Sequence, residues 1–352
     1  MLISVTYRDR VKIATRSVRR PVIGIVSMLV TLAFLAAACS SAPPGATTSG
    51  TPSTPTPLTS SPVASSSSVA PTTHAPTSTR PAAGSGSPVH VSVNLSDGNQ
   101  VGVGLPIIAT FPVKITDARG FQAVTKVTVN GVPASGAWFF EFSDPASGHP
   151  MEAHYRLQSY WPAHALIHLE LPVQGLSAGP GLVFDDSLTL DFSTGAEHVL
   201  TVDNATHRLT VRTDGAVWGT FPVSLGGSKS PTLRGTKVVM EKLPKVCMSG
   251  TEPDGSTYHL CNVQFDERLT YGGEYLHAAP WNVYNIMHGI NSSNGCTNLL
   301  PADAQRLYGF LGVGDVVQYP NADGPPMGLG LGYGDWNVPW AQWLTGGAVH
   351  TH

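Results

Sequence analysis

Short segments in which apolar and polar residues alternate strictly dominate the chain from residue 89 onward. Val89–Leu95 and Ala165–Leu171 alternate in this way, and turn-forming pairs such as Asn130-Gly131 lie between such segments. A period of two residues predicts strands that are buried on one face. No helical period of useful length occurs between residues 89 and 196. We therefore predict a β-sandwich of the immunoglobulin-like type in this region.

The region from residue 197 to 321 shows the same strand signal and one clear helix. The helix is expected from about Pro301 to Leu311, because proline suits the first helical position, Asp303 suits the first turn and Gly312 is a stop signal. Apolar residues recur every three or four positions along it. The expected strands are 198–203, 207–212, 217–223, 237–241 and 315–319.

The last segment, residues 322–352, is rich in tryptophan. Trp336, Trp340 and Trp343 are spaced as on one face of a helix, which predicts packing against a core rather than stacking on carbohydrate. The predicted fold class is mostly β. An Ig-like β-sandwich (89–196) precedes a β-sandwich-like domain with one main helix (197–321), and we expect the extension (322–352) to pack on that second domain.

The first 38 residues resemble an export signal. They hold six of the 20 lysines and arginines, and an apolar run follows Arg20 and closes in Ala36-Ala-Ala-Cys39. Small residues before a cysteine resemble a bacterial lipoprotein signal, so we expect cleavage before Cys39 and a lipid on its thiol. The alternative is an uncleaved membrane helix. Either way, the rest of the chain is expected outside the cytoplasmic membrane, on its outer face or in the cell-wall space, where disulfides persist.

Residues 39–88 are expected to form a disordered tether, and charge is scarce throughout the chain. The tether is almost wholly Ser, Thr, Pro, Ala and Gly, and Arg80 is its only charged residue. Charged residues make up 12% of the chain, and the formal net charge is −3. A nucleic-acid-binding protein with a broad basic surface is therefore excluded as a function class.

Counting the cysteines singles out one residue. With Cys39 assigned to lipid, Cys247 and Cys261 bracket a turn-rich loop and are predicted to form a disulfide. Cys296 is then the odd thiol, and an odd thiol in an exported protein is a candidate for reactivity. His277 and His288 are the nearby candidate bases. From the spacing alone, coincidence is the alternative explanation for a cysteine and two histidines lying so close in the sequence. No second close pair of metal ligands is present, so a zinc site is disfavoured and we expect no metal.

The segments around Cys296 resemble the active-site signature of the L,D-transpeptidases that cross-link peptidoglycan. The matching strings are His277-Ala-Ala-Pro-Trp281 and Asn291-Ser-Ser-Asn-Gly-Cys-Thr-Asn298. Pro231-Thr-Leu-Arg-Gly235 resembles the family's Pro-x-x-x-Gly turn, and the tryptophan-rich tail and the Ig-like domain with Tyr160-Trp-Pro162 resemble its actinobacterial branch. The resemblance covers nearly all of residues 90–345.

The resemblance implies a role for each residue of the site. Cys296 is the nucleophile, His277 its general base, and the backbone carbonyl of Ala278 orients the histidine. Gly295 and Cys296 supply oxyanion N–H groups, with Asn294 as a third candidate. The residues assigned to the substrate side or to bracing it are Asn298, Tyr258, Met248, Trp281 and His288; from the residues alone, His288 is expected to bond the loop backbone.

Two departures from the family pattern stand out. Asn294 occupies the place of the histidine that usually precedes Gly-Cys, and asparagine can neither act as a base nor carry positive charge. The interval between His277 and Cys296 is one residue longer than the pattern. The resemblance still implies an active enzyme, with altered reactivity at Cys296.

The implied reaction joins two diaminopimelate residues through a cysteine thioester and releases D-alanine from a tetrapeptide donor, with no cofactor. The implied partners are peptidoglycan stem peptides and, as inhibitors, carbapenem-type β-lactams, with no nucleic acid. Three alternatives remain open: an L,D-carboxypeptidase, an enzyme that attaches protein to peptidoglycan, and a catalytically weakened envelope lipoprotein.

Overall fold

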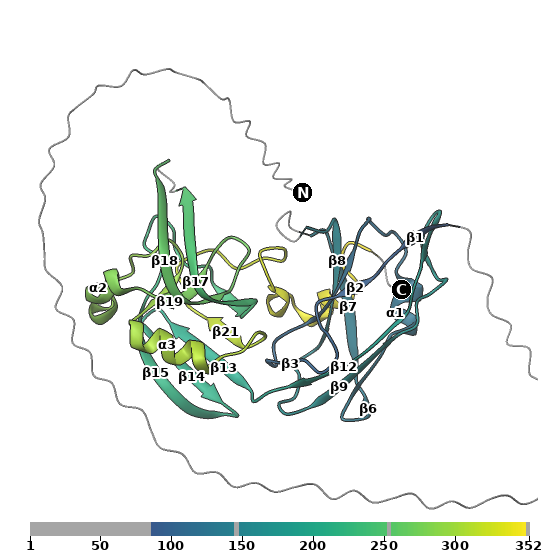
Figure 1. Cartoon of the computed structure of the whole chain (residues 1–352), viewed down its shortest axis with the longest axis horizontal. Coiled ribbons are helices and arrows are strands. Elements are labelled where there is room, and N and C mark those ends of the chain that lie inside the picture. Colours follow the sequence, from purple (N-terminus) through teal and green to yellow (C-terminus); the bar gives the residue numbers. More distant parts are fainter. Residues whose placement is uncertain (1–85, 144–147, 252–254, 350–352) are drawn as a thin grey trace, which may run out of the picture. The chain divides into compact units, whose positions relative to one another are not determined.

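The computed structural model describes residues 86–143, 148–251 and 255–349. The proposed signal segment, the tether and Cys39 lie outside the described residues. Among the residues described, no helix combines the length and the apolar character needed to cross a bilayer. The mostly-β fold class predicted from the alternating pattern is confirmed (Figure 1).

The first domain consists of short strands in three sheets. A four-stranded sheet has the order β2-β4-β8-β7, a five-stranded sheet the order β3-β12-β9-β5-β6, and a small sheet the order β1-β11-β10. Its elements are β1 (Ser87–Val89), β2 (Ser92–Val93), β3 (Gln100–Val101), β4 (Ile107–Phe111), α1 (Arg119–Val124), β5 (Lys126–Val129), β6 (Val132–Pro133), β7 (Gly136–Glu141), β8 (Met151–Leu157), β9 (Leu166–Leu171), β10 (Ser177–Gly179), β11 (Leu182–Phe184) and β12 (Leu188–Thr194).

Sequence reasoning named two strand segments in this domain. The second, Ala165–Leu171, corresponds to β9, whereas two other local features were missed. The segment expected to be one strand over Val89–Leu95 is divided, because β1 pairs with β11 while β2 pairs with β4 in a different sheet. The six-residue helix α1 was not predicted, since fewer than two turns give no readable period. The core is apolar and aromatic. Trp138 and Trp161 lie fully inside it, and no cysteine is among the described core residues.

The second domain is one curled, mixed sheet of nine strands in the order β16-β21-β13-β14-β15-β20-β19-β18-β17 (Figure 1). Helix α3 packs against it with Ala304 and Leu307 buried. The elements are β13 (His198–Asp203), β14 (Arg208–Thr213), β15 (Ala216–Ser224), β16 (Gly235–Val238), β17 (Glu241–Thr251), β18 (Thr257–Arg268), β19 (Tyr275–Ala278), η2 (Pro280–Asn282), α2 (Val283–His288), β20 (Thr297–Leu299), α3 (Pro301–Phe310) and β21 (Val316–Tyr319).

The sequence pattern predicts the strands β13, β14, β15 and β21 and the helix α3, and the expected strand 237–241 is divided between the end of β16 and the start of β17. The remaining strands and short helices of this domain were not predicted. Helix α3 begins at Pro301 as predicted and ends one residue before the predicted end, because Leu311 adopts an extended conformation. Two pairs in the sheet are parallel, β13 with β21 and β19 with β20. The second parallel pair matters for function, since it places His277 beside Asn298, two residues after Cys296.

The tryptophan-rich extension contains η3 (Asp335–Asn337) and α4 (Trp340–Trp343). Trp343 is fully buried, stacks on Phe139 of β7 with ring centroids 4.9 Å apart, and donates from Nε1 to the Ala137 carbonyl at 2.8 Å. Asn337 also accepts a hydrogen bond from the Thr236 N–H of β16 at 2.7 Å. The extension therefore contacts the Ig-like strands as well as the second domain. Its contact with the Ig-like strands was not predicted.

We expect Trp343→Ala to lower the free energy of unfolding by about 3–5 kcal/mol, because it leaves a large cavity and an unpaired carbonyl. Chemical denaturation followed by tryptophan fluorescence and circular dichroism would measure the loss. Trp281→Ala is the matched control, since that indole is 52% exposed. Equal losses in the two variants would contradict the packing described for Trp343.

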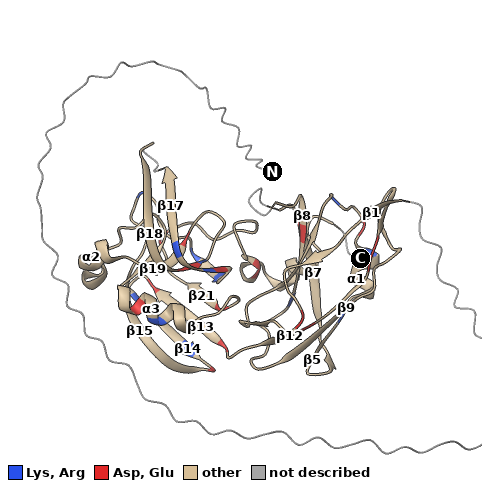
Figure 2. Cartoon of the chain, viewed as in Figure 1, with Lys and Arg blue, Asp and Glu red and all other residues tan. Residues whose placement is uncertain are grey.

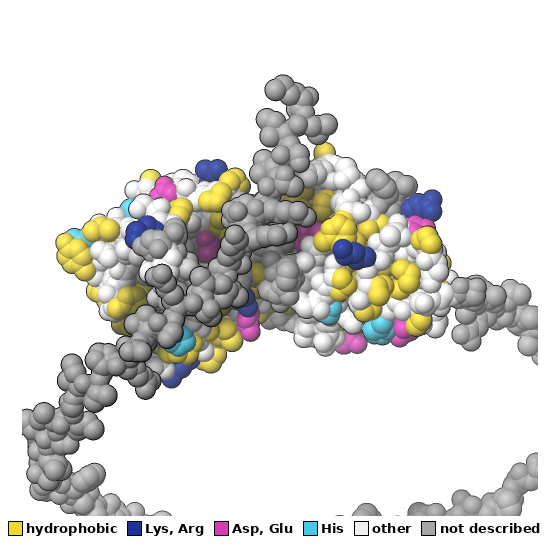
Figure 3. Space-filling view, turned by 90° about the horizontal axis from the view of Figure 1, so that it is seen from above, with side chains coloured by type: hydrophobic (Ala, Val, Ile, Leu, Met, Phe, Trp, Pro, Cys, Tyr) yellow, Lys and Arg dark blue, Asp and Glu magenta, His cyan; other side chains and the backbone are white. Residues whose placement is uncertain are grey.

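Charged residues are few, and the described ones are spread over both domains (Figure 2). On the face shown in Figure 3, lysine and arginine side chains lie apart from one another, and apolar side chains form small groups between polar surface. The described residues that are visible on this face form no continuous basic stripe of the kind that binds a nucleic-acid backbone.

Candidate active site

Cys296 lies at the end of a turn that leads directly into β20. Gly295, just before it, has a φ of +105°, and a Cβ there would meet the Glu274 side chain at 3.4 Å, so this position favours glycine. The cysteine is 7% exposed, and its thiol points to the Gly273 carbonyl at 3.5 Å. Burial raises the pKa of the Cys296 thiol to about 12. The resting sulfur is therefore a protonated thiol.

Two hydroxyl groups hold the backbone on both sides of the thiol. Thr232 donates to the Gly295 carbonyl at 2.8 Å, and Ser293 donates to the Cys296 carbonyl at 2.5 Å. Thr232 belongs to the Pro231–Gly235 turn singled out in the sequence. That turn therefore has a structural role, since it fixes the peptide plane just before the cysteine.

A buried ion pair lies behind the same turn. The Lys237 ammonium donates to the Glu274 carboxylate, whose other oxygen accepts from the Leu233 N–H at 2.8 Å. Sequence reasoning missed both residues, although a lysine within the apolar run of β16 was a visible signal. Because the two charges are opposite, the pair leaves little net field at Cys296.

His277 lies on β19 and is 2% exposed. Its Nδ1 lies 2.9 Å from the Ala278 carbonyl, so Nδ1 carries the proton and donates it to that oxygen. Its Nε2 lies 2.9 Å from the Asn298 side-chain nitrogen and accepts from it. Burial lowers the pKa of His277 to about 4. The imidazole is therefore neutral, and its basic nitrogen Nε2 is held by the hydrogen bond from Asn298.

A network of asparagines orients this histidine. Asn282 donates to the Asn298 oxygen at 2.9 Å, which forces the Asn298 NH₂ group toward His277. Asn282 in turn accepts from Asn285 at 2.8 Å and from the Ser292 hydroxyl at 3.1 Å. The sequence analysis named Asn298 but not Asn282, because nothing local to residue 282 shows that its side chain meets residue 298.

The two catalytic candidates open into one cleft of about 440 Å³. Both Cys296 and His277 line it, and so do the predicted residues Asn294, Asn298, Met248, Tyr258 and Trp281. His288 does not belong to this lining. It is exposed on α2, where its Nδ1 lies 2.8 Å from the Tyr284 carbonyl of the same helix, whereas a bond to a loop carbonyl was expected.

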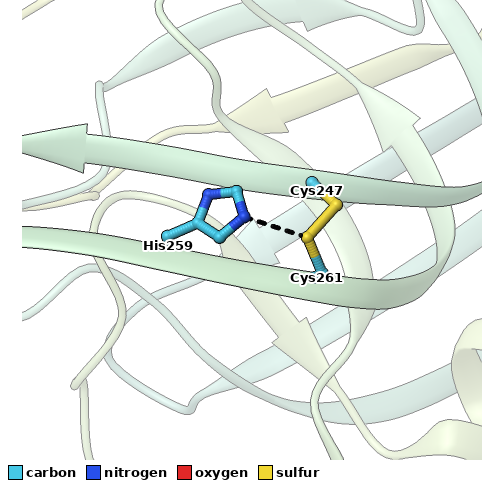
Figure 4. Close-up of side chains that lie close together, drawn as sticks. All are labelled: Cys247, His259 and Cys261. Atoms are coloured by element: carbon cyan, nitrogen blue, oxygen red, sulfur yellow. Dashed lines mark hydrogen bonds between the residues drawn. A yellow bond between two sulfur atoms is a disulfide. The ribbon is translucent and has the colours of Figure 1, made fainter.

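The hairpin of β17 and β18 forms one wall of the cleft and carries the predicted disulfide. Cys247 and Cys261 are bonded across the two strands (Figure 4). His259 points at this bridge with Nε2 3.2 Å from the Cys261 sulfur, and its Nδ1 lies 2.6 Å from the Ser249 hydroxyl. Bonded sulfurs are not thiolate ligands, so with the bridge closed these three residues do not make a zinc site. The bridge instead fixes the register of the hairpin beside Met248 and Tyr258.

This geometry suits acyl transfer by a cysteine that is deprotonated only when a substrate is bound. A neutral imidazole and a protonated thiol share a cleft, and the base is oriented by a carbonyl on one nitrogen and an amide on the other. Asn294 keeps a backbone N–H at the cysteine loop but brings no positive charge. Thiolate formation therefore depends on His277.

The chain is similar to known proteins in both of its domains. Residues 197–318 match the model of the L,D-transpeptidase catalytic domain, and residues 63–177 match a bacterial Ig domain. L,D-transpeptidase 1 of Mycobacterium tuberculosis is 30% identical over 235 residues, which cover 66% of this chain and 84% of the relative. L,D-transpeptidase 2 of the same species is 31% identical over 274 residues, covering 74% of this chain and 64% of that protein's length.

Among solved structures, the L,D-transpeptidase LdtMt1 in complex with imipenem matches with a TM-score of 0.53 and 27% identity, over 65% of this chain and 98% of that one. The fold and site together define a cysteine-dependent acyltransferase. The chain belongs to the L,D-transpeptidase family, with a bacterial Ig domain ahead of its catalytic domain.

We expect Asn298→Ala to lower kcat/KM for acylation by about 10–100-fold, the usual cost of losing a group that orients a functional histidine. The side chain of Asn298 is buried and bonds His277 directly. Stopped-flow acylation by imipenem would measure the change, with the unfolding midpoint recorded alongside. Asn285→Ala, two hydrogen bonds further away, is expected to lose less; the reverse order would contradict the network.

Proposed function

We propose that the chain is an L,D-transpeptidase that links two diaminopimelate residues of peptidoglycan. The observation that carries this proposal is the pairing of a neutral, oriented His277 with a buried Cys296 thiol in one cleft, on a chain of this family. The donor is a tetrapeptide stem that ends in D-alanine, and the acceptor is the side-chain amine of a second stem.

Acylation begins when Nε2 of His277 exchanges its hydrogen bond from Asn298 for the thiol proton of Cys296. The Cys296 sulfur then attacks the diaminopimelate carbonyl carbon, and backbone N–H groups of the 294–296 turn stabilise the oxygen that becomes negative. When the C–N bond breaks, the imidazolium returns its proton to the departing D-alanine amine. A thioester on Cys296 remains, and His277 is neutral again.

The acceptor completes the cycle. Its amine attacks the thioester carbon, His277 takes the amine proton and passes it to the departing sulfur, and a new amide bond forms. The β17–β18 hairpin, with Met248 and Tyr258 in the cleft wall, guides the acyl chain and keeps water from the thioester. Water in place of the amine would make the enzyme a carboxypeptidase.

The proposal is tested with the purified chain and a disaccharide-tetrapeptide substrate. Mass spectrometry should show the loss of one alanine per donor together with a covalent dimer. Alanine loss without dimer would establish the carboxypeptidase alternative, and transfer to an added protein amine would establish protein attachment. If neither alanine release, dimer formation nor transfer to protein is detected, the remaining alternative is the catalytically weakened envelope lipoprotein.

The pH dependence follows from the two buried groups. Because the pKa of His277 lies at about 4 and that of Cys296 at about 12, the neutral base and the protonated thiol coexist between these values. We expect the rate of imipenem acylation to be nearly constant from about pH 5 to 8 and to fall as pH drops toward 4, when the imidazole becomes protonated. An inflection near pH 6.5 would show that His277 titrates normally, which the burial argument does not allow.

We also propose that the chain is exported and held at the outer face of the cytoplasmic membrane by lipid on Cys39. The basic and apolar residues of the first 38 positions support this, as does an intrachain disulfide. Labelling cells with a fatty-acid analogue should mark the wild-type chain and leave Cys39→Ala unmarked. Equal labelling of both would disprove the anchor.

We further propose that carbapenems inhibit the enzyme by acylating Cys296. The LdtMt1 structure solved with imipenem supports this proposal.

A further inference from the structure

A second cluster of titratable side chains lies far from the catalytic cysteine in the sequence and is also buried. Glu141 ends β7, Glu152 and His154 lie on β8, and Asp335 lies in η3 of the extension. Glu141 and Glu152 are directly opposite each other in the antiparallel pair, and Glu152 and His154 are two residues apart and so share one face. Their exposed fractions are 8%, 3%, 2% and 0%.

The imidazole of His154 is the centre of the cluster. Its Nδ1 lies 2.6 Å from the Asp335 carboxylate, so this nitrogen donates a hydrogen bond. Its Nε2 faces one oxygen of Glu141 and one of Glu152, each at 3.6 Å, which is too long for a hydrogen bond. These two oxygens and Nε2 are buried and have no hydrogen-bond partner among the described residues.

The charge of the cluster needs compensation. Three carboxylates surround one imidazole, and an unpaired charge away from water is strongly unfavourable. Arg156, on the same strand, directs its guanidinium elsewhere: it donates to the Val338 carbonyl at 2.7 Å and lies over the Trp343 ring at 4.2 Å. A divalent cation would balance two of the three carboxylate charges.

We propose that Glu141, Glu152 and His154 bind a zinc ion, with Asp335 orienting the histidine. The three candidate donor atoms lie within 4.8 Å of one another. Two ligand atoms at about 2.0–2.1 Å from a tetrahedral zinc are about 3.4 Å apart, close to the 3.6 Å observed here. A histidine whose second nitrogen donates to a carboxylate is the usual arrangement at such sites.

The ligand types favour zinc over other divalent ions. Calcium and magnesium prefer oxygen ligands alone, whereas imidazole suits zinc, and zinc binds mixed nitrogen and oxygen sites more tightly than manganese does. Glu152 also borders a cavity of about 410 Å³, together with Tyr271 and Tyr333, so one of the three ligand residues lies beside open space. The bound ion would join β7 and β8 of the Ig-like domain to the extension that carries Asp335.

Zinc uptake by the full chain tests the proposal. The chain carries Cys296→Ala so that the catalytic thiol cannot bind metal, is stripped with EDTA, and is kept under non-reducing conditions so that Cys247 and Cys261 stay bonded. Titration with zinc sulfate should show one ion per chain. A zinc concentration about 100-fold above Kd should raise the Tm by about 5 °C or more.

The double variant Glu141→Gln and Glu152→Gln keeps the shape of both side chains and removes both anionic ligands. We expect its zinc affinity to fall at least about 100-fold. The matched control is His168→Gln with Glu170→Gln, an exposed histidine and glutamate 3.6 Å apart, which should bind zinc as before. Unchanged affinity in the first variant, or no uptake by the parent chain, would overturn the proposal.

X-ray absorption at the zinc edge keeps the proposal testable even if the double variant fails to fold. The zinc-loaded parent chain should show one imidazole and two or three oxygen neighbours. A sulfur neighbour would place the ion at the β17–β18 hairpin instead, and two or more imidazoles would place it at another histidine site; either result would overturn the assignment.

Discussion

Replacing Cys296 with alanine should lower the rate of D-alanine release from a tetrapeptide donor by at least about 10⁴-fold, because the covalent route through the thioester disappears. The side chain is small and buried, and its surroundings are held by hydrogen bonds from Thr232 and Ser293 to backbone atoms rather than to sulfur. The fold should therefore survive the change. Amino-acid analysis of the released alanine measures the rate.

Two controls make this loss interpretable. The variant's unfolding midpoint should stay within a few degrees of the parent's, which separates lost chemistry from lost structure. Cys296→Ser keeps the shape and retains a weaker nucleophile, so its activity should lie near that of the alanine variant. Release within tenfold of the parent rate in either variant would mean that another group attacks the donor.

Replacing His277 with glutamine should lower acylation by about 10²–10⁴-fold, the usual contribution of a general base. Glutamine can still occupy the space between the Ala278 carbonyl and Asn298, but it cannot take the proton of the thiol. Because Asn294 brings no charge to the site, nothing nearby replaces the imidazole in this role. Pre-steady-state acylation by imipenem would isolate the affected step.

His288→Gln is the matched control for that experiment. This histidine is exposed on α2 and outside the cleft lining, so we expect its replacement to change acylation less than about threefold. If His288→Gln caused the larger loss of acylation rate, His288 rather than His277 would be the general base. The other of the two candidate bases named from the sequence would then be correct.

The sequence allowed prediction of features that depend on local pattern. Strand β13 matches its predicted bounds, α3 begins at the predicted Pro301, and the disulfide joins the two cysteines that bracket the turn-rich hairpin. Cys296 stood out by elimination. These inferences needed only periodicity, turn chemistry and the number of cysteines.

Features that depend on contacts between distant residues could not be predicted. Asn282 orients Asn298 only because η2 folds back onto β20, and Thr232 bonds Gly295 across 63 residues. The pairing of His154 with Asp335 spans 181 residues and two parts of the fold. A single sequence carries no signal for such pairs, since each residue is unremarkable among its own neighbours.

Intact-mass spectrometry after incubation with imipenem tests the assignment of Cys296 as the acylated nucleophile. We expect one imipenem adduct per chain, mapped by peptide digestion to the segment containing Cys296 and absent from Cys296→Ala. An adduct of equal yield on Cys296→Ala, or no adduct on the parent chain under conditions that acylate a mycobacterial L,D-transpeptidase, would contradict it.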